Sequence, residues 1–243
     1  MNVALACIAK NETLYIEEWI QYHLYLGFDK VFIYQNDWRL KLDSPLVKKI
    51  EFDGGGRQSE AYNSFLSTYY SEYDWVAFLD VDEFLVLKEH DSIKSFLNRY
   101  NEFDGVAINW YLFGDNNQPS PTNNYSVLNR FTKRSKKIDK HIKCIVKTNI
   151  DSKYNIHSPV RGNIVDCNKN MVIGDFNERA DDSIAQINHY FTKTRDEWKL
   201  KKERGRAPAK NAMRLDGDFD LHNKNEVEDL TALNFFVKKS NIF

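Results

Sequence analysis

The ten residues Trp75–Phe84, WVAFLDVDEF, are the part of the sequence that decides the fold. Residues 75–79 are apolar without a break, as expected of a strand that is buried on both faces of a sheet. Asp80 and Asp82 follow directly, two positions apart. Carboxylate oxygens are the ligands that hard divalent cations prefer, and such sites leave coordination positions for substrate phosphates. The stretch predicts a metal-assisted site at a strand end, and the alternative is a solvated acidic loop.

Strand and helix patterns alternate around this stretch. Continuous apolar runs predict further strands at residues 3–9, 31–34 and 106–108. Helical spacing of apolar residues predicts three helices between them, the first of which Gly27 closes. Their inward residues are Ile16, Trp19, Ile20 and His23; Ala61, Phe65, Leu66 and Tyr69; and Ile93, Phe96, Leu97 and Tyr100. Strands joined by helices pair in parallel, and their ligands bind beyond the carboxyl ends of the strands.

The second half of the sequence is less regular. Residues 115–125 are rich in Asn, Pro and Ser and predict a loop. Thr194 and Glu197 form a capping box that opens a basic helix ending at Gly205. An amphipathic helix is predicted from Val227 onward. Residues 216–220 resemble the start of a calcium loop, but the glycine and the glutamate that such a loop needs are absent, so an acidic surface turn is expected.

Composition limits the function classes. The 243 residues are 42% hydrophobic and 28% charged, which is typical of a globular domain, and the formal net charge of −1 argues against a nucleic-acid partner. No apolar run approaches the roughly 18 residues of a membrane span, and the N-terminus lacks a secretory pattern. The three cysteines are widely spaced and fit neither a disulfide framework nor a zinc site. We expect a cytoplasmic protein.

Several motifs in order resemble nucleotide-sugar glycosyltransferases of families 2 and 92, which have the GT-A fold. The resemblance covers about residues 3–206 and includes Asp80–Phe84, which matches the metal motif of these families. The other matching segments are Ala9–Glu12, Glu18-Trp19, Tyr22-His23, Leu26-Gly27, Gln58 with Ala61–Asn63, Asn109-Trp110, Phe113-Gly114, Arg130-Phe131, Asn188–Tyr190, Lys193 and Arg204-Gly205.

The resemblance implies an α/β fold of the GT-A, Rossmann-like type, with a mixed, mostly parallel sheet flanked by helices. It implies one glycosyltransferase domain at residues 1–215, and we expect residues 216–243 to form an acidic turn and a helix appended to it. The resemblance also implies a metal-dependent transfer from a nucleotide-diphosphate sugar, with a UDP-sugar favoured, to a saccharide or lipid-linked acceptor. Assembly of surface polysaccharide or lipopolysaccharide is the pathway that it favours.

The same resemblance assigns candidate site residues. Asp80 would contact the donor ribose or the metal, and Asp82 would be a direct ligand of Mn or Mg. His189 is a candidate third metal ligand, since imidazole suits Mn, with a structural histidine as the alternative. The residues that would bind the nucleotide sugar are Ala9, Asn11, Asp37, Gln58 and Asp80.

The catalytic base is less defined by the sequence. An inverting transferase needs a carboxylate within reach of the acceptor hydroxyl. Asp115 is the first candidate because it follows Phe113-Gly114, which resembles the acceptor side of the family. Asp139, Asp175 and Glu178 are further candidates, and each of the four has a structural role as its alternative. His157 is a candidate for facing the acceptor, or else a turn residue.

The basic residues of the segment 193–210 have three possible roles: they hold the donor diphosphate, contact anionic lipid at the inner membrane face, or form a solvated helix face. These residues are Lys193, Lys199, Lys201, Lys202, Arg204, Arg206 and Lys210.

Two alternative functions remain open. Asp80–Asp82 also resembles the motif of haloacid-dehalogenase phosphatases, in which Asp80 would be a nucleophile. The other alternative is a sugar-nucleotide-binding module without catalysis.

Overall fold

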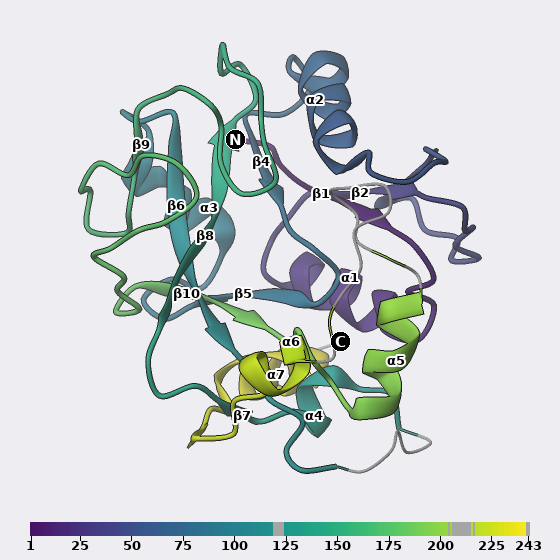
Figure 1. Cartoon of the computed structure of the whole chain (residues 1–243). Coiled ribbons are helices and arrows are strands. Elements are labelled where there is room, and N and C mark those ends of the chain that lie inside the picture. Colours follow the sequence, from purple (N-terminus) through teal and green to yellow (C-terminus); the bar gives the residue numbers. More distant parts are fainter. Residues whose placement is uncertain (119–123, 204, 206–214, 216, 242–243) are drawn as a thin grey trace.

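Nine strands form the main sheet in the part of the chain that the structure, a computed structural model, describes: residues 1–118, 124–203, 205, 215 and 217–241 (Figure 1). The strands are β1 (Val3–Ala9), β2 (Lys30–Gln35), β3 (Val47–Glu51), β4 (Trp75–Phe78), β5 (Glu83–Leu87), β6 (Gly105–Leu112), β8 (Asp139–Lys147), β9 (Ile164–Val165) and β10 (Ala185–His189). A second sheet pairs β7 (Lys133–Arg134) with β11 (Val227–Glu228).

The strand order of the main sheet is β3-β2-β1-β4-β8-β6-β10-β5, with β9 beside β6. β3, β2, β1 and β4 are mutually parallel, and β10 is parallel to β6. β8 is antiparallel to both of its neighbours, β4 and β6, and β5 is antiparallel to β10. The predicted fold class, a mixed and mostly parallel sheet flanked by helices, is confirmed.

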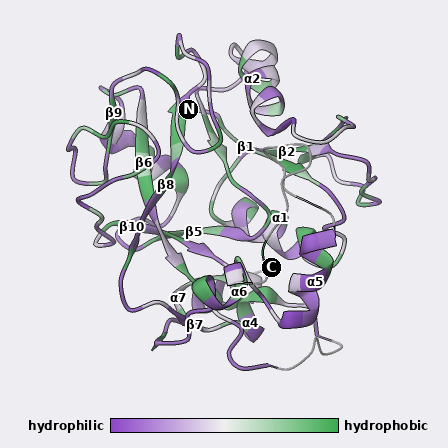
Figure 2. Ribbon diagram, in the orientation of Figure 1, coloured by the Kyte–Doolittle hydropathy of each residue, from purple (hydrophilic) through white to green (hydrophobic). Residues whose placement is uncertain are grey.

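Helices cover both faces of the sheet. They are α1 (Ile16–Tyr25), α2 (Gln58–Tyr69), α3 (Ile93–Leu97), α4 (Val127–Arg130), α5 (Arg195–Glu203), α6 (Gly217–His222) and α7 (Thr231–Ser240), and a 3₁₀ turn spans Asn98–Tyr100. One hydrophobic cluster contains residues of α1, α3 and α7, and the other contains residues of α2. In Figure 2 the interior strands are hydrophobic, whereas α5 is largely hydrophilic.

Strand β1 lies in the middle of the packing. Val3, Leu5 and Cys7 belong to the cluster under α1, and Ala4 and Ala6 belong to the cluster under α2. Successive side chains of a strand point to opposite faces, so a strand covered on both sides is apolar at every position. The continuous apolar run at residues 3–9 is explained in this way.

The predicted elements of the first half are present, with additions. The predicted strands and helices correspond to β1, α1, β2, α2, β4, α3 with its 3₁₀ turn, and β6. β3 and β5 were not predicted, because Val47–Glu51 carries three charges and Glu83–Leu87 follows the acidic turn without a break. Gly27 follows α1 with φ of 99°, a left-handed conformation that glycine adopts without strain.

The C-terminal part differs in detail from the prediction. Residues 217–222 form the short helix α6 where a turn was expected, and Val227 lies in β11 before α7 begins at Thr231. α7 packs on α1 and β5 through aromatic side chains such as Phe235 and Phe236. Among the described residues, no helix combines the length and the apolar character needed to cross a bilayer.

Candidate active site

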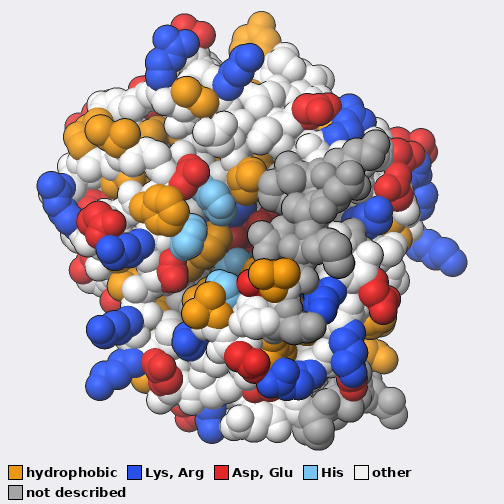
Figure 3. Space-filling model, viewed as in Figure 1, with side chains coloured by type: hydrophobic (Ala, Val, Ile, Leu, Met, Phe, Trp, Pro, Cys, Tyr) orange, Lys and Arg blue, Asp and Glu red, His pale blue; other side chains and the backbone are white. Residues whose placement is uncertain are grey.

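A cavity of about 550 Å³ opens at the edge of the sheet where the parallel strands β1, β4, β6 and β10 have their carboxyl ends. Residues from all four of these ends line it, as does the first part of β8, which is antiparallel and therefore starts at this edge. Histidine side chains gather around the hollow in the middle of this face (Figure 3). Its volume is in the range of pockets that enclose small ligands.

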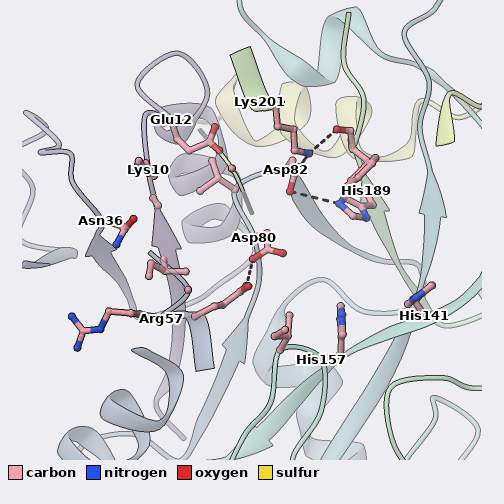
Figure 4. A pocket seen from close by; sticks show the side chains of 18 of the residues that line it. Lys10, Glu12, Asn36, Arg57, Asp80, Asp82, His141, His157, His189 and Lys201 are labelled. Atoms are coloured by element: carbon pink, nitrogen blue, oxygen red, sulfur yellow. Dashed lines mark hydrogen bonds and ion pairs between the residues drawn. The ribbon is translucent and has the colours of Figure 1, made fainter. Parts of the chain in front are cut away.

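Asp80 lies at the centre of the cavity, directly after β4 (Figure 4). Its Oδ1 accepts a hydrogen bond of 2.7 Å from Gln58 Nε2, at the first residue of α2. Its Oδ2 lies 3.2 Å from Nζ of Lys143, a fully buried residue of β8. The Asp80 side chain is 34% exposed, so a ligand in the cavity can contact it.

Asp82 lies deeper and is held between Lys201 and His189. Lys201 Nζ, from α5, is 2.5 Å from Asp82 Oδ2 and also donates to the carbonyl of Phe191. Burial raises the pKa of Asp82, but the charge of Lys201 and the neighbouring His189 outweigh it, so the pKa lies well below the usual range. Asp82 is therefore ionised at neutral pH.

His189 is the last residue of β10, and its Nε2 lies 3.7 Å from Asp82 Oδ1. Burial lowers the pKa of His189 to about 3, against the opposing effect of Asp82. Its Nδ1 is buried and has no hydrogen-bond partner in the described part of the chain. A neutral imidazole is the form of histidine that binds a metal ion.

Glu83 and Lys143 form a buried pair beneath the two aspartates. Lys143 Nζ lies 3.5 Å from Glu83 Oε2, and both side chains are inaccessible to solvent. Burial, together with the charges of Asp80 and Asp82, raises the pKa of Glu83 well above its ordinary value despite the opposing charge of Lys143. The pKa of Lys143 is raised by Asp80 and Glu83 despite its burial. Lys143 is thus a fixed positive charge behind Asp80.

One half of the cavity is formed by β1, β2 and the turn before α2. Ala9 and Lys10 from the end of β1, Asn36 after β2 and the glycines 54–56 line it. Asn36 donates its amide to the carbonyls of Phe52 and Gly54, which fixes the turn beside β2. In Figure 4, Lys10, Asn36 and Arg57 lie on one side of Asp80.

The other half is a wall of aromatic rings. Trp110 of β6 stacks on His141 of β8, with ring centroids 5.1 Å apart, and contacts His189 at 4.5 Å and His157 at 5.3 Å. His141 Nδ1 is 2.7 Å from Asp139 Oδ1. Burial and the charge of Lys143 lower the pKa of His157 to about 4.

The structure brings five of the seven residues predicted to bind the donor or the metal to the cavity wall: Ala9, Gln58, Asp80, Asp82 and His189. Asn11 and Asp37 do not line it but adopt left-handed backbone conformations next to it, with φ of 54° and 46°. Asp37 accepts from Lys10 and from the backbone of Gly54, so it shapes the turn that lines the cavity.

Asp115, the first candidate for the base, is not brought to the cavity. Its carboxylate accepts hydrogen bonds from Asn117 N and Asn225 Nδ2, which tie the loop after β6 to the chain before β11. Asp175 accepts from Ser158, and Glu178 forms an exposed pair with Lys140. Of the four carboxylates considered, Asp139 is the one that lines the cavity.

The basic segment divides between the site and the surface. Lys201 lines the cavity, whereas Lys199 is exposed and pairs with Asp196, and Lys193 lies over the ring of Tyr15. Arg204, Arg206 and Lys210 lie outside the described residues. The sequence did not identify Lys143 or His141, and it named Lys201 only as one of seven basic residues that could hold the donor diphosphate. The charged residue inside the apolar stretch 142–146 is the one local signal for Lys143.

The chemistry of Asp80, Asp82 and His189 fits a divalent cation. Two carboxylates and a neutral imidazole are ligands that Mn accepts. The buried Nδ1 of His189 makes no hydrogen bond to the described residues, so the ring is not fully bonded within the protein. As the side chains stand, no group of three His, Cys, Asp or Glu in the described residues encloses a metal ion. Lys201 occupies Oδ2 of Asp82, so a cation there has to displace it.

Curated relatives and a solved structure are similar to parts of this chain. A glycosyltransferase family 92 protein of Arabidopsis thaliana is 30% identical over 122 residues, which cover 40% of this chain and 20% of that protein. One of Ricinus communis is 24% identical over 126 residues, 46% of this chain and 23% of that protein. The chain thus aligns with about a fifth of the length of these relatives. The crystal structure of S. aureus TarS has a TM-score of 0.41 and 14% identity over 79% of this chain and 37% of that chain.

The sequence model of one family matches most of the chain. It spans residues 55–223, and this range contains Asp80, Asp82, the aromatic wall, His189 and Lys201. The motifs from Gln58 to Gly205 therefore lie in the matched range, whereas those between Ala9 and Gly27 precede it. This chain belongs to glycosyltransferase family 92.

Proposed function

We propose that this protein is a metal-dependent glycosyltransferase that moves a sugar from a nucleotide-diphosphate sugar, of which a UDP-sugar is favoured, to a saccharide or lipid-linked acceptor. The observation that carries the proposal is the position of Asp80, Asp82 and His189 between two different halves of one cavity in a family 92 chain. A transferase has to hold its donor and its acceptor side by side, and the two halves of the cavity would offer a place for each.

The donor would occupy the half formed by β1, β2 and the turn before α2. Ala9 and the glycines 54–56 offer backbone that a nucleotide can approach closely, and Asn11 and Asp37 hold the backbone next to it. Its diphosphate would then reach Asp80 and Asp82. Gln58 orients Asp80 through the 2.7 Å hydrogen bond to Oδ1.

Asp80, Asp82 and His189 would hold Mn or Mg. A bound divalent cation would supply charge to stabilise the diphosphate leaving group. The protein adds a charge of its own at the same place, because Lys143 is fixed behind Asp80. Charges that are already oriented cost little reorganisation during the reaction.

The acceptor would lie against the aromatic wall formed by Trp110, His141 and His157. Aromatic rings with polar edges suit sugars, which present apolar faces and hydroxyl groups. For the pathway we propose surface-polysaccharide or lipopolysaccharide assembly in the cytoplasm. With a lipid-linked acceptor, exposed lysines such as Lys199 would contact the inner face of the membrane.

The experiment that tests the proposal is a thermal-shift panel of UDP-glucose, UDP-galactose, UDP-N-acetylglucosamine and GDP-mannose, each with Mn, with Mg and with a chelator. A ligand that binds the native state raises Tm, by the equivalent of about 2.7 kcal/mol at a hundred times its Kd. We expect one donor to raise Tm in the presence of metal and to be consumed when acceptors are added. No shift with any donor would contradict the proposal.

Asp82→Asn is the matching variant. It removes the negative charge that would bind the cation while keeping the size of the side chain, so we expect the metal-dependent part of the donor shift to disappear and turnover to fall at least a hundredfold. Asp91→Asn, on an exposed loop, is the control and should behave as the parent. Unchanged turnover in Asp82→Asn would show that Asp82 does not hold the metal.

The two alternatives predict other results. A binding module would show donor affinity without transfer or hydrolysis for any acceptor. A phosphatase would form a covalent phosphate on Asp80 and ignore nucleotides, but membership of family 92 does not support that chemistry. The Asp80 carboxylate is also held on both oxygens, by Gln58 and by Lys143.

A further inference from the structure

His141 lines the cavity and is held by Asp139, two residues earlier in β8. Asp139 Oδ1 accepts from His141 Nδ1 at 2.7 Å and from the backbone N–H of His141 at 2.8 Å. A carboxylate can only accept, so Nδ1 carries the hydrogen in the neutral ring. The lone pair of the neutral imidazole is then on Nε2. The His141 side chain is 41% exposed and is accessible from the cavity.

The position of the His141 ring is fixed by its neighbours. Trp110 stacks on it with an interplanar angle of 14°, and Phe176 contacts it with a centroid distance of 4.5 Å. The amide of Asn109 donates to the carbonyls of Asp139 and Lys140, at the point where the register between β6 and β8 shifts. A ring held on several sides needs little reorganisation before it reacts.

The wall around His141 contains polar atoms that lack a partner. Trp110 Nε1 and His157 Nδ1 are buried and have no hydrogen bond within the described residues. Unpaired buried polar atoms are costly, so such atoms at a cavity wall indicate a polar ligand that completes them. The hydroxyl groups of a saccharide would do so.

His141 also stands at a suitable place relative to Asp80. His141 lies two positions before Lys143 in β8, next to the point where the register with β6 shifts. Lys143 contacts Asp80 directly. In Figure 4, His157 and His141 lie on the side of Asp80 opposite to Lys10, Asn36 and Arg57, which is the side left for the acceptor.

We propose that His141, held by Asp139, is the general base that activates the acceptor hydroxyl. The inference rests on the glycosyltransferase function proposed above. The acceptor oxygen forms a bond to the anomeric carbon of the donor sugar while the bond from that carbon to the diphosphate oxygen breaks, and its electron pair leaves with the phosphate. The hydroxyl proton moves to Nε2 of His141, and Asp139 stabilises the resulting imidazolium.

The test compares His141→Ala and His141→Gln with the parent protein, using the donor of the panel above that the parent consumes. General-base catalysis contributes about 10²–10⁴-fold, so we expect kcat to fall by that factor in both variants while the donor KM and the donor-induced rise in Tm stay unchanged. Added imidazole should restore part of kcat in His141→Ala. His90→Ala, outside the cavity, is the matched control.

Asp139→Asn tests the positioning role. An asparagine oxygen still accepts from Nδ1 but carries no charge, so we expect a smaller loss of kcat than in His141→Ala, with unchanged KM and no rescue by imidazole. Turnover of His141→Ala within threefold of the parent, or a loss that imidazole does not restore, would overturn the assignment of His141. A parent protein that binds and consumes no donor would instead overturn the glycosyltransferase function itself, and the inference with it.

Discussion

Asp82 has a cation of the protein itself at the position where a metal ion is proposed to bind. Lys201 Nζ is 2.5 Å from its Oδ2, and the two side chains are only 8% and 10% exposed. Lys201 also lies over the ring of Phe191, 4.2 Å from its centroid, which holds the ammonium group near Asp82. The ammonium and a divalent cation cannot both take the same carboxylate oxygen, so Lys201 competes with the metal inside one molecule.

Lys201→Met is expected to raise the affinity for Mn²⁺ by tenfold or more, which corresponds to about 1.4 kcal/mol. The variant removes the competing charge and leaves Asp82 buried without its partner, so a metal ion then has more to gain by binding. A Mn²⁺ titration followed by electron paramagnetic resonance, without donor, measures the change. Lys199→Met, two residues earlier on the exposed face of α5, is the control. Equal or weaker Mn²⁺ affinity in Lys201→Met would contradict the competition.

Single residues differ in how far the sequence identifies them. Asp80 and Asp82 stand out locally, because they follow an apolar strand in a recognisable motif. Lys201 could not be paired with Asp82 from the sequence, since 119 residues separate them and a lysine in a basic helix is normally solvated. His141 was not predicted, because it lies near the beginning of its strand. That end of β8 reaches the cavity only because β8 runs antiparallel to β4 and β6, and the sequence does not indicate this direction.

Other motif residues have structural roles at the level of elements. Trp19 Nε1 donates to the carbonyl of Glu83, Tyr22 OH donates to the carbonyl of Leu85, and the backbone N–H of Leu85 donates to His23 Nε2. These three side chains of α1 fix β5, the strand that begins directly after Asp80–Asp82. Trp19, Tyr22 and His23 therefore belong to the motif pattern because they hold the strand next to the site.

Helix α5, which carries Lys201, is anchored through Glu197. The predicted capping box is confirmed: the backbone N–H of Thr194 donates to Glu197 Oε2, and that of Glu197 donates to Thr194 Oγ1. Arg130 donates to both oxygens of Glu197, at 2.8 Å each, and both side chains are buried. Tyr15 OH donates to the same carboxylate. One glutamate thus joins α5 to α4 and to the start of α1.

Glu197→Gln is expected to lower the free energy of unfolding by about 3 kcal/mol, because it leaves the buried guanidinium of Arg130 without a counter-charge. Urea denaturation at pH 7 measures this loss. Thr194 and the rest of the capping box remain in the variant, so α5 itself should still form. A loss below 0.5 kcal/mol would show that Arg130 finds another partner.

The stability of the parent should also depend on pH through Glu197. Burial raises the pKa of Glu197, but hydrogen bonds from Arg130, Thr194 and Tyr15 outweigh it and lower the pKa from 4.5 to about 2. The unfolded state therefore binds more protons between these values, so the stability from this group is present above about pH 4.5 and is lost as the pH falls toward 2. Urea denaturation curves measured from pH 6 to pH 3 should show this fall in the free energy of unfolding in the parent and not in Glu197→Gln.

At the level of the whole molecule, the first half follows local patterns more closely than the second. β1, β2 and β4 are buried, parallel and joined through helices, so apolar runs and helical spacing predict them. β8 inserts between β4 and β6, antiparallel to both, from a segment that is rich in basic residues. The pairing of β8 with β4 and β6 depends on packing between residues far apart in the sequence, so no local sequence pattern predicts it.

The C-terminal residues 216–243 were expected to be appended to the same domain, and the contacts of the described residues 217–241 tie this part to the core. Asp229, just before α7, accepts from Arg134 Nε and from Gln186 Nε2 of β10. Phe235 contacts Tyr22 with a centroid distance of 5.2 Å, and Phe236 contacts Tyr25 at 5.8 Å. The helix therefore covers α1 on the face that supports β5.

Simultaneous substitution of Phe235 and Phe236 by alanine is expected to destabilise the entire domain. Truncating a buried phenylalanine costs about 3–5 kcal/mol, and we expect about 3 kcal/mol for the two together because both are only partly buried. For a chain of this size that lowers Tm by about 6–12 °C. Calorimetry should show one transition moved as a whole, because α7 packs on the same cluster as α1 and β5. Val237→Ala, at an exposed position of the same helix, should leave Tm within about 1 °C of the parent. A separate early transition, with the main one unmoved, would instead mean that α7 folds as an independent appendage and that α1 holds β5 without it.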